Sequence, residues 1–253
     1  MLTAYIQKAA DVLLTLASLV LGGGSLLVFL FFLHAGGFQF LALGLSPAAA
    51  LGLDAAVSLC FFAQHSGMVR GPAKRWMDRH IPSVYQGAVY SILSGAMLLL
   101  VMGLWQQVPV VLYAADGAAE ALIRILFFLP VIGFVWSGLT LDSLDSLGIK
   151  TIWHRLLCKP EIRPHLVIRG PYQWVRHPMY AGVFVFLWAV PVVTPDRLMF
   201  NLLWSGWLYA GVLMEESDLV AAYGDAYRRY QRFVPMLLPL RINPGKKMKQ
   251  QDF

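Results

Sequence analysis

The stretch from Val12 to Leu33, VLLTLASLVLGGGSLLVFLFFL, contains 22 residues, and none of them carries a charge. A helix needs about 20 mostly apolar residues to cross the hydrocarbon core of a bilayer. Hydrocarbon offers the backbone no hydrogen-bond partners, so a lone spanning stretch has to be helical. We therefore expect residues 12–33 to form a transmembrane helix.

Similar apolar stretches recur along the whole chain. Of its 253 residues, 58% are hydrophobic and 13% are charged, whereas about 25% are charged in an ordinary soluble domain. Further spans are predicted at 48–66, 86–108, 120–141, 180–194 and 197–214. The sequence therefore predicts an all-α, polytopic integral membrane protein with about five to six transmembrane helices. We expect one membrane domain (1–253), in which N-terminal helices (1–142) precede a loop, a helical hairpin and a tail (143–253).

The last two apolar runs are predicted to form that hairpin. Residues 180–194 would rise about 22 Å as a helix, less than the hydrocarbon thickness of about 30 Å. Pro191, Pro195 and Asp196 follow at its end. Because proline interrupts helices, we expect the hairpin to turn near Pro195.

Lys and Arg are distributed unevenly among the loops. One lies in the N-terminal tail, four between 67 and 83, six between 143 and 179, and seven after Met214. Six segments would bring all of these to one side of the membrane. Because cytoplasmic loops are enriched in Lys and Arg, we expect both termini on the cytoplasmic side of the membrane. The same rule explains the net charge of +6, so no nucleic-acid partner is expected.

Other function classes are disfavoured by what the sequence contains. Cys60 and Cys158 are far apart and do not indicate a disulfide framework. Internal repeats are not evident, and Asp54 and His65 are the main ionisable residues within the predicted spans. A transporter of ions would carry more intramembrane charge. No metal site is expected, and the oligomeric state is left open.

Charged and aromatic residues gather at both ends of the predicted hairpin. Residues 167–181, VIRGPYQWVRHPMYA, precede its first helix, and Pro178 is suited to the first helical position. Glu215 and Glu216 follow its second helix. Both ends are predicted to be cytoplasmic, so cations and carboxylates would meet at one depth. The residues alone are compatible with a functional site or with interfacial anchors beside a solvated helix end.

Two sequence resemblances bear on this choice. The segment 176–182, RHPMYAG, is preceded by Gly170-Pro171-Tyr172 and followed by Glu215-Glu216. This pattern resembles the isoprenylcysteine carboxyl methyltransferase and phospholipid methyltransferase superfamily. Upstream, the segments 62–68 (FAQHSGM) and 74–76 (KRW) are similar to bacterial methanethiol S-methyltransferases and NnrU-type membrane proteins.

The first resemblance implies a methyltransferase that uses S-adenosylmethionine. This cofactor presents a carboxylate, an ammonium, a sulfonium and an adenine, which suits a site with both charge signs beside aromatic rings. The hairpin is expected to flank the site. The implied cofactor-binding residues are Tyr172, Arg176, His177, Pro178, Tyr180, Gly182, Glu215 and Glu216.

The second resemblance implies a small, lipid-soluble thiol as acceptor, with methanethiol converted to dimethyl sulfide. A thiol reacts as its thiolate, so a base or a nearby cation would help. His65 is the candidate base, although it could equally be a hydrogen-bonded histidine at a helix end. Arg176 and Glu215 complete the candidate catalytic set. The alternatives are methylation of a lipid amine or an isoprenylcysteine carboxylate, and a non-enzymatic NnrU-like role in nitrogen-oxide metabolism.

Overall fold

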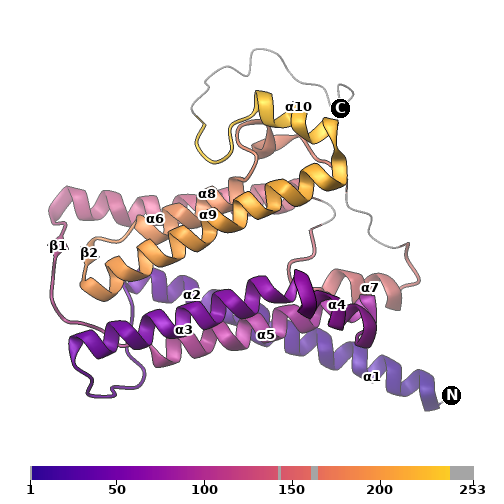
Figure 1. Cartoon of the computed structure of the whole chain (residues 1–253), viewed down its shortest axis with the longest axis horizontal. Helices are drawn as coiled ribbons and strands as arrows, with labels where there is room; N and C mark the ends of the chain where they lie inside the picture. Colours follow the sequence, from indigo (N-terminus) through magenta and orange to yellow (C-terminus); the bar gives the residue numbers. More distant parts are fainter. Residues whose placement is uncertain (1, 142–143, 161–164, 240–253) are drawn as a thin grey trace. The chain divides into compact units, whose positions relative to one another are not determined.

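The computed structural model describes residues 2–141, 144–160 and 165–239, and these residues are predominantly helical (Figure 1). Parts of the predicted loop and tail, at 142–143, 161–164 and 240–253, lie outside the described residues. The chain divides into two compact units. The first unit contains Met1–Val110, Asp145–Arg163 and Thr194–Phe200, and the second contains Val111–Leu144, Pro164–Val193 and Asn201–Phe253. The single membrane domain expected from the composition stays a prediction.

The helices of the first unit pack around one central helix. The N-terminal span is continuous, because α1 (Leu2–Ala17) leads through the π-helical turn η1 (Ser18–Gly23) into α2 (Gly24–Ala35). This span and α3 (Pro47–Met68) both pack on α5 (Ser83–Leu104). Two short helices complete the unit, α4 (Gly71–His80) beside α3 and α7 (Ile149–Leu156) beside α5 and α1.

Small residues allow η1 and α5 to approach each other closely. A Cβ atom at Gly95 would lie 2.1 Å from the Leu21 carbonyl oxygen, and one at Gly22 would lie 2.0 Å from Ser91 Oγ. Close backbone approach through small residues is a common way for membrane helices to associate, because lipid provides no hydrophobic drive between them.

In the second unit, α6 (Gly117–Thr140) packs against α8 (Pro178–Trp188). A Cβ atom at Gly182 would lie 2.9 Å from Phe134 Cε2, so the absence of a side chain at this position allows α8 to pack against α6. Two short strands, β1 (Tyr113–Ala114) and β2 (Val192–Val193), pair antiparallel and join the segments before α6 and after α8. The 3₁₀ helix η2 (Gly170–Gln173) lies on α6, and α10 (Asp225–Phe233) completes the unit.

The predicted hairpin is confirmed. Trp188 Nε1 of α8 donates to Ser205 Oγ of α9 (Pro195–Tyr223) at 3.0 Å, and Tyr180 of α8 lies against Gly211 of α9. The α9 helix starts at Pro195, where the turn was expected. It begins in the first unit and continues in the second.

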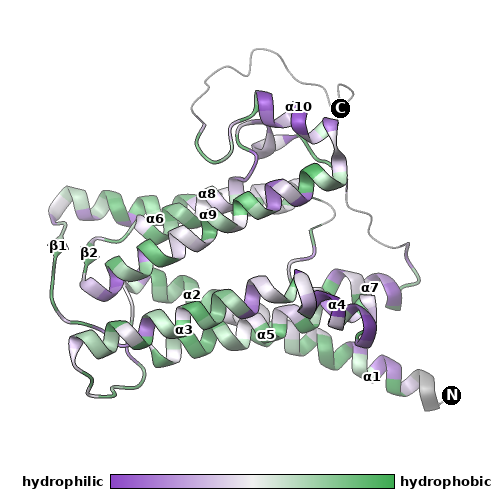
Figure 2. Cartoon of the chain, in the orientation of Figure 1, coloured by the Kyte–Doolittle hydropathy of each residue, from purple (hydrophilic) through white to green (hydrophobic). Residues whose placement is uncertain are grey.

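The number of spans differs from the expected five to six. Four helical segments of the described chain are long and apolar enough to cross a membrane: Tyr5–Ala35, Pro47–Met68, Ser83–Leu104 and Gly117–Thr140. The α8 helix has 11 residues, which rise about 16 Å, so it is too short to cross the bilayer alone. Apolar residues dominate α2 and α5, whereas α4 and α10 are polar (Figure 2). The chain is an integral membrane protein of the all-α class.

Candidate functional site

A cavity of about 210 Å³ lies within the second unit, where η2, the start of α8, the end of α9 and α10 meet. Charged or polar side chains on its wall include Arg176, His177 and Glu215. Its apolar and aromatic residues are Leu141, Leu144, Leu166, Val167, Tyr172, Pro178, Met179, Tyr180, Leu219, Tyr223, Tyr227 and Tyr230. The cavity therefore joins charge of both signs to an aromatic surface.

The segment before α8 is fixed by local sequence. Gly170 has a φ of +58°, and a Cβ atom there would lie 2.8 Å from Thr140 Oγ1, so only glycine fits against the end of α6. Arg169 Nη2 donates to the Thr140 carbonyl at 3.1 Å. Pro178 occupies the first turn of α8, where its missing N–H leaves no helical bond unmade. These contacts hold Arg176 and His177 at the foot of α8.

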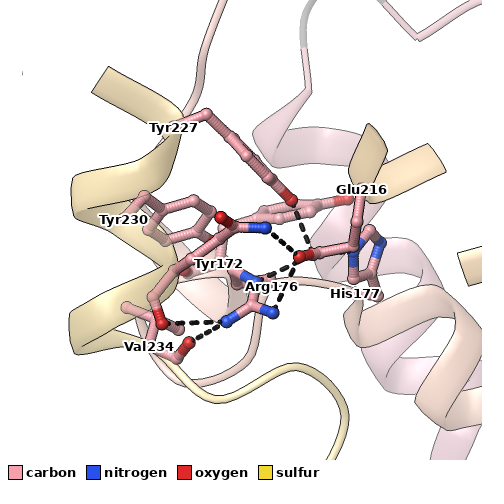
Figure 3. A network of polar contacts seen from close by, with 8 residues as sticks. Tyr172, Arg176, His177, Glu216, Tyr227, Tyr230 and Val234 are labelled. Atoms are coloured by element: carbon pink, nitrogen blue, oxygen red, sulfur yellow. Dashed lines mark hydrogen bonds and ion pairs between the residues drawn. The ribbon is translucent and has the colours of Figure 1, made fainter. Parts of the chain in front are cut away.

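Glu216 lies at the centre of a hydrogen-bonded network (Figure 3). Its Oε1 accepts from Arg176 Nε at 2.8 Å, from His177 Nε2 at 2.6 Å and from the Tyr227 hydroxyl at 2.8 Å. Its Oε2 accepts from Arg176 Nη2 at 2.8 Å and from Gln231 Nε2. A carboxylate offers about four lone-pair sites, so these five bonds leave little capacity for a ligand.

The ionisation of Glu216 follows from this network. Burial alone would raise its pKa, but hydrogen bonds from His177, Arg176, Gln231 and Tyr227 lower it well below its usual range. Glu216 is therefore an anion that is buried together with the cation it requires. Burial, reinforced by the neighbouring Glu216 charge, raises the pKa of Tyr227 far above its ordinary value, which keeps this hydroxyl a donor.

Arg176 also anchors the last turn of α10 and the segment that follows it. Its Nη1 donates to the carbonyl oxygens of Gln231 and Val234 (Figure 3). The backbone N–H groups of Arg176 and His177 donate to the carbonyls of Pro235 at 2.9 Å and Met236 at 3.1 Å. Four of the five guanidinium N–H groups are used in this way. Most of the hydrogen-bonding capacity of Arg176 is therefore used to hold parts of the protein together.

Glu215 differs from its neighbour, because it lines the cavity. Burial, followed by the charge of Glu215, raises the pKa of Tyr172 to about 12, while the side chain of Ser137 acts in the opposite direction. The Tyr172 hydroxyl is buried beside the side chain of Ser137. A carboxylate and a neutral phenol therefore stand close together on the cavity wall.

The structure brings most of the predicted cofactor residues together. Tyr172, Arg176, His177, Pro178, Tyr180 and Glu215 line the cavity. Glu216 lies behind the wall and holds Arg176 and His177. Gly182 is absent from the wall of the described cavity and serves the packing of α8 on α6.

His65 belongs to the first unit. Its Nε2 lies 2.6 Å from the Tyr90 hydroxyl, and its ring centroid lies 5.1 Å from that of Phe61. Across residues 2–141, 144–160 and 165–239, no three His, Cys, Asp or Glu side chains are arranged to hold a metal ion.

Sequence reasoning gave no role to several residues of α10. Tyr227 and Tyr230 are buried with Ile168 and Val234 in a small core, and the Tyr230 hydroxyl donates to the Tyr172 carbonyl. Tyr227 and Tyr230 are three positions apart in α10, a spacing typical of one face of a helix that could have identified them. Nothing local marks Gln231, whose partner Glu216 is 15 residues away.

Comparison with known proteins identifies relatives of this chain. A model of the phospholipid methyltransferase family matches residues 127–226. Methanethiol S-methyltransferase of Mycobacterium tuberculosis is 32% identical over 197 residues, which are 76% of this chain and 81% of that protein. The enzyme of the same name from Pseudomonas sp. (strain GM41(2012)) is 33% identical over 77% of this chain and 75% of its own length. Nurim from Sus scrofa is 30% identical over 67% of this chain and 68% of its own length. No solved structure gives a significant match.

Proposed function

This chain belongs to the family of membrane methyltransferases that includes the methanethiol S-methyltransferases, and from that premise we propose that it methylates a small thiol with S-adenosylmethionine as donor. Methanethiol is the favoured acceptor and dimethyl sulfide the product. The observation that carries the proposal is the cavity of the second unit, where Glu215 and the Tyr172 hydroxyl lie on a wall of aromatic residues.

The residues of the cavity suit the charges of this donor. The Glu215 carboxylate would accept hydrogen bonds from the ammonium group, a charge-assisted contact worth about twice a neutral one. The faces of Tyr180 and Tyr223 would favour the sulfonium cation by about 0.5–2 kcal/mol. Arg176 retains one N–H for a carboxylate, and Pro178 contributes the backbone of the wall.

When bound, S-adenosylmethionine supplies a methyl group on a positively charged sulfur, which is already activated for transfer. The protein then has to position the reactants and exclude water. Leu166, Met179 and Leu219 supply apolar wall for this purpose. The network around Glu216 keeps the foot of α8 rigid.

The acceptor is proposed from the relatives, several of which are named methanethiol S-methyltransferase and align with most of this chain. A thiol must release its proton to react, and His65 is the proposed acceptor of that proton. The Tyr90 hydroxyl, 2.6 Å from His65 Nε2, would orient the imidazole. A position in a bacterial inner membrane, with both termini and the cofactor site on the cytoplasmic side, is part of the same proposal.

A larger apolar acceptor is the second candidate. An apolar groove of about 810 Å³ runs along α6 and α8 in the second unit, lined by residues such as Leu129, Phe184 and Trp188. Such a groove would suit the chain of a lipid amine or an isoprenylcysteine. Of these two acceptors, the lipid amine is favoured, because the matched family is that of the phospholipid methyltransferases.

The test is to incubate the purified protein with methyl-labelled S-adenosylmethionine and one acceptor at a time, chosen from methanethiol, a phospholipid amine and a prenylcysteine. We expect labelled dimethyl sulfide in the headspace, with a rate that rises with pH as the thiolate fraction grows. His65→Ala should lower turnover more than donor affinity. Label in the lipid extract without dimethyl sulfide would reject the thiol in favour of the second candidate.

A further inference from the structure

The helix α7 of the first unit presents three different faces. Ile152 is fully buried against the unit, whereas Trp153 and Leu157 are 48% and 56% exposed. The two exposed residues are four positions apart and so share one side of the helix. Apolar residues exposed beside cationic ones are typical of helices that lie in a membrane interface.

The third face of α7 lines a cavity. Thr151, His154 and Arg155 of α7, with Cys158 and Lys159 just beyond its end, enclose about 500 Å³ against Ser83 and Val84 at the start of α5. Two of these residues, Arg155 and Lys159, are basic. None of the described residues that line the cavity is acidic.

Arg155 is held rigidly at the edge of this cavity. Its Nη2 donates to Asp11 and, at 2.7 Å, to the Tyr85 hydroxyl, and its guanidinium stacks over the Tyr85 ring at 4.8 Å. Its hydrogen bonds to Asp11 and Tyr85 both leave from Nη2, and the side chain remains 32% exposed. A guanidinium has five N–H donors, so others remain for a ligand. The carboxylate of Asp11 balances the positive charge of Arg155. Lys159 then gives the described wall of the cavity an excess of one positive charge.

We propose that this cavity binds the phosphate of an anionic phospholipid, whose acyl chains lie beside Trp153 and Leu157. A phosphodiester carries a single negative charge, which matches the excess. Arg155 and Lys159 would donate to its oxygens in charge-assisted hydrogen bonds. The loops that form the cavity are those predicted to face the cytoplasm, where basic pockets beside membrane helices bind anionic head groups.

Lipid is favoured over free phosphate because the two cations and the exposed apolar residues lie close together on α7 and the turn that follows it. Inorganic phosphate would contact only the cations, because it has no acyl chains to lie beside Trp153 and Leu157. A zwitterionic lipid would bring a choline cation close to Lys159, so phosphatidylcholine should bind more weakly than phosphatidylglycerol.

Cys158 provides a direct probe of occupancy, because it lines the cavity and is exposed. Replacing Cys60, the other cysteine of the chain, with alanine leaves Cys158 as the single target for an uncharged maleimide. The alkylation rate would be measured in detergent with increasing dioctanoyl phosphatidylglycerol, dioctanoyl phosphatidylcholine or inorganic phosphate. We expect protection by phosphatidylglycerol, and little from the other two at the same concentration.

Two charge-matched variants in the Cys60→Ala background sharpen the result. Lys159→Gln should raise the phosphatidylglycerol concentration for half-protection about fivefold. Arg228→Gln also removes one exposed cation, from α10, and should leave that concentration unchanged. Equal protection by phosphatidylcholine, equal protection by inorganic phosphate, or no shift in Lys159→Gln would each overturn the proposal.

Discussion

Glu215 and Glu216 are adjacent in the sequence but serve different purposes. Glu216 accepts five hydrogen bonds from four side chains of the second unit and belongs to its interior. Glu215 lines the cavity and influences Tyr172. Substitutions at the two positions should therefore be separable by measuring stability and donor affinity independently.

Glu216→Gln should destabilise the protein by about 3–5 kcal/mol, because it leaves Arg176 buried without its anion. Glu215→Gln should leave the thermal unfolding temperature nearly unchanged and weaken binding of S-adenosylmethionine about tenfold, as expected for a lost hydrogen bond to a charged group. Thermal unfolding and calorimetry on both variants measure the two effects. Equal unfolding temperatures in the two variants would contradict the structural role of Glu216.

The depressed pKa of Glu216 also predicts a dependence of stability on pH. Because the carboxyl binds its proton less readily in the folded state, its contribution to stability is fully present above its ordinary pKa of 4.5 and is lost as the pH falls through the lower folded value. The stability difference between wild type and Glu216→Gln should therefore shrink below about pH 4.5. Unfolding measured at pH 7 and pH 4 tests this, and a difference that grows on acidification would refute it.

At this scale the sequence predicted which residues gather at the site but not how they are connected. Tyr172, Arg176, His177 and Glu215 were placed together by the motif and by the two ends of the hairpin. The pairing of Arg176 with Glu216 was not foreseen, because a carboxylate that binds a ligand and one that binds an arginine look alike in sequence. Only the three-dimensional arrangement shows that the capacity of Glu216 is already used.

The packing of α8 on α6 depends on Gly182. Gly182→Val should cost about 1–3 kcal/mol, because its side chain would overlap Phe134 and Pro130. Gly211→Ala in α9 is the matched control, since its Cβ would meet Tyr180 only at an ordinary contact distance of 3.8 Å. Thermal unfolding of both variants in detergent checks the comparison. A stable Gly182→Val protein would show that α8 is free to move away from α6.

The elements themselves were largely predictable. Hydrophobic runs gave the four long helices and the hairpin, since a bilayer demands length and apolarity of each span. The short strands β1 and β2 were missed, because two residues each provide no detectable alternation. The lengths of α7 and α10 could not be predicted either. These helices lie outside the apolar spans, so no hydrophobic run defines their ends.

The orientation of the whole molecule is predicted by its loop charges. Reporter fusions at Gly37 and Asp116 should report the periplasm, because the segments around them carry almost no Lys or Arg. Fusions at Arg75 and Lys150 should report the cytoplasm. A cytoplasmic signal at Gly37 or Asp116 would reject this orientation of the four long helices.

The contacts between Arg176 and the segment after α10 also affect how the protein is made. Arg176 lies 58 residues before its partner Val234, and the whole α8–α9 hairpin lies between them. During synthesis, Arg176 therefore emerges from the ribosome long before its partners exist. The wall of the cavity closes only after the hairpin has formed and α10 has folded back, so a chain that stalls before α10 cannot form the proposed methyltransferase site.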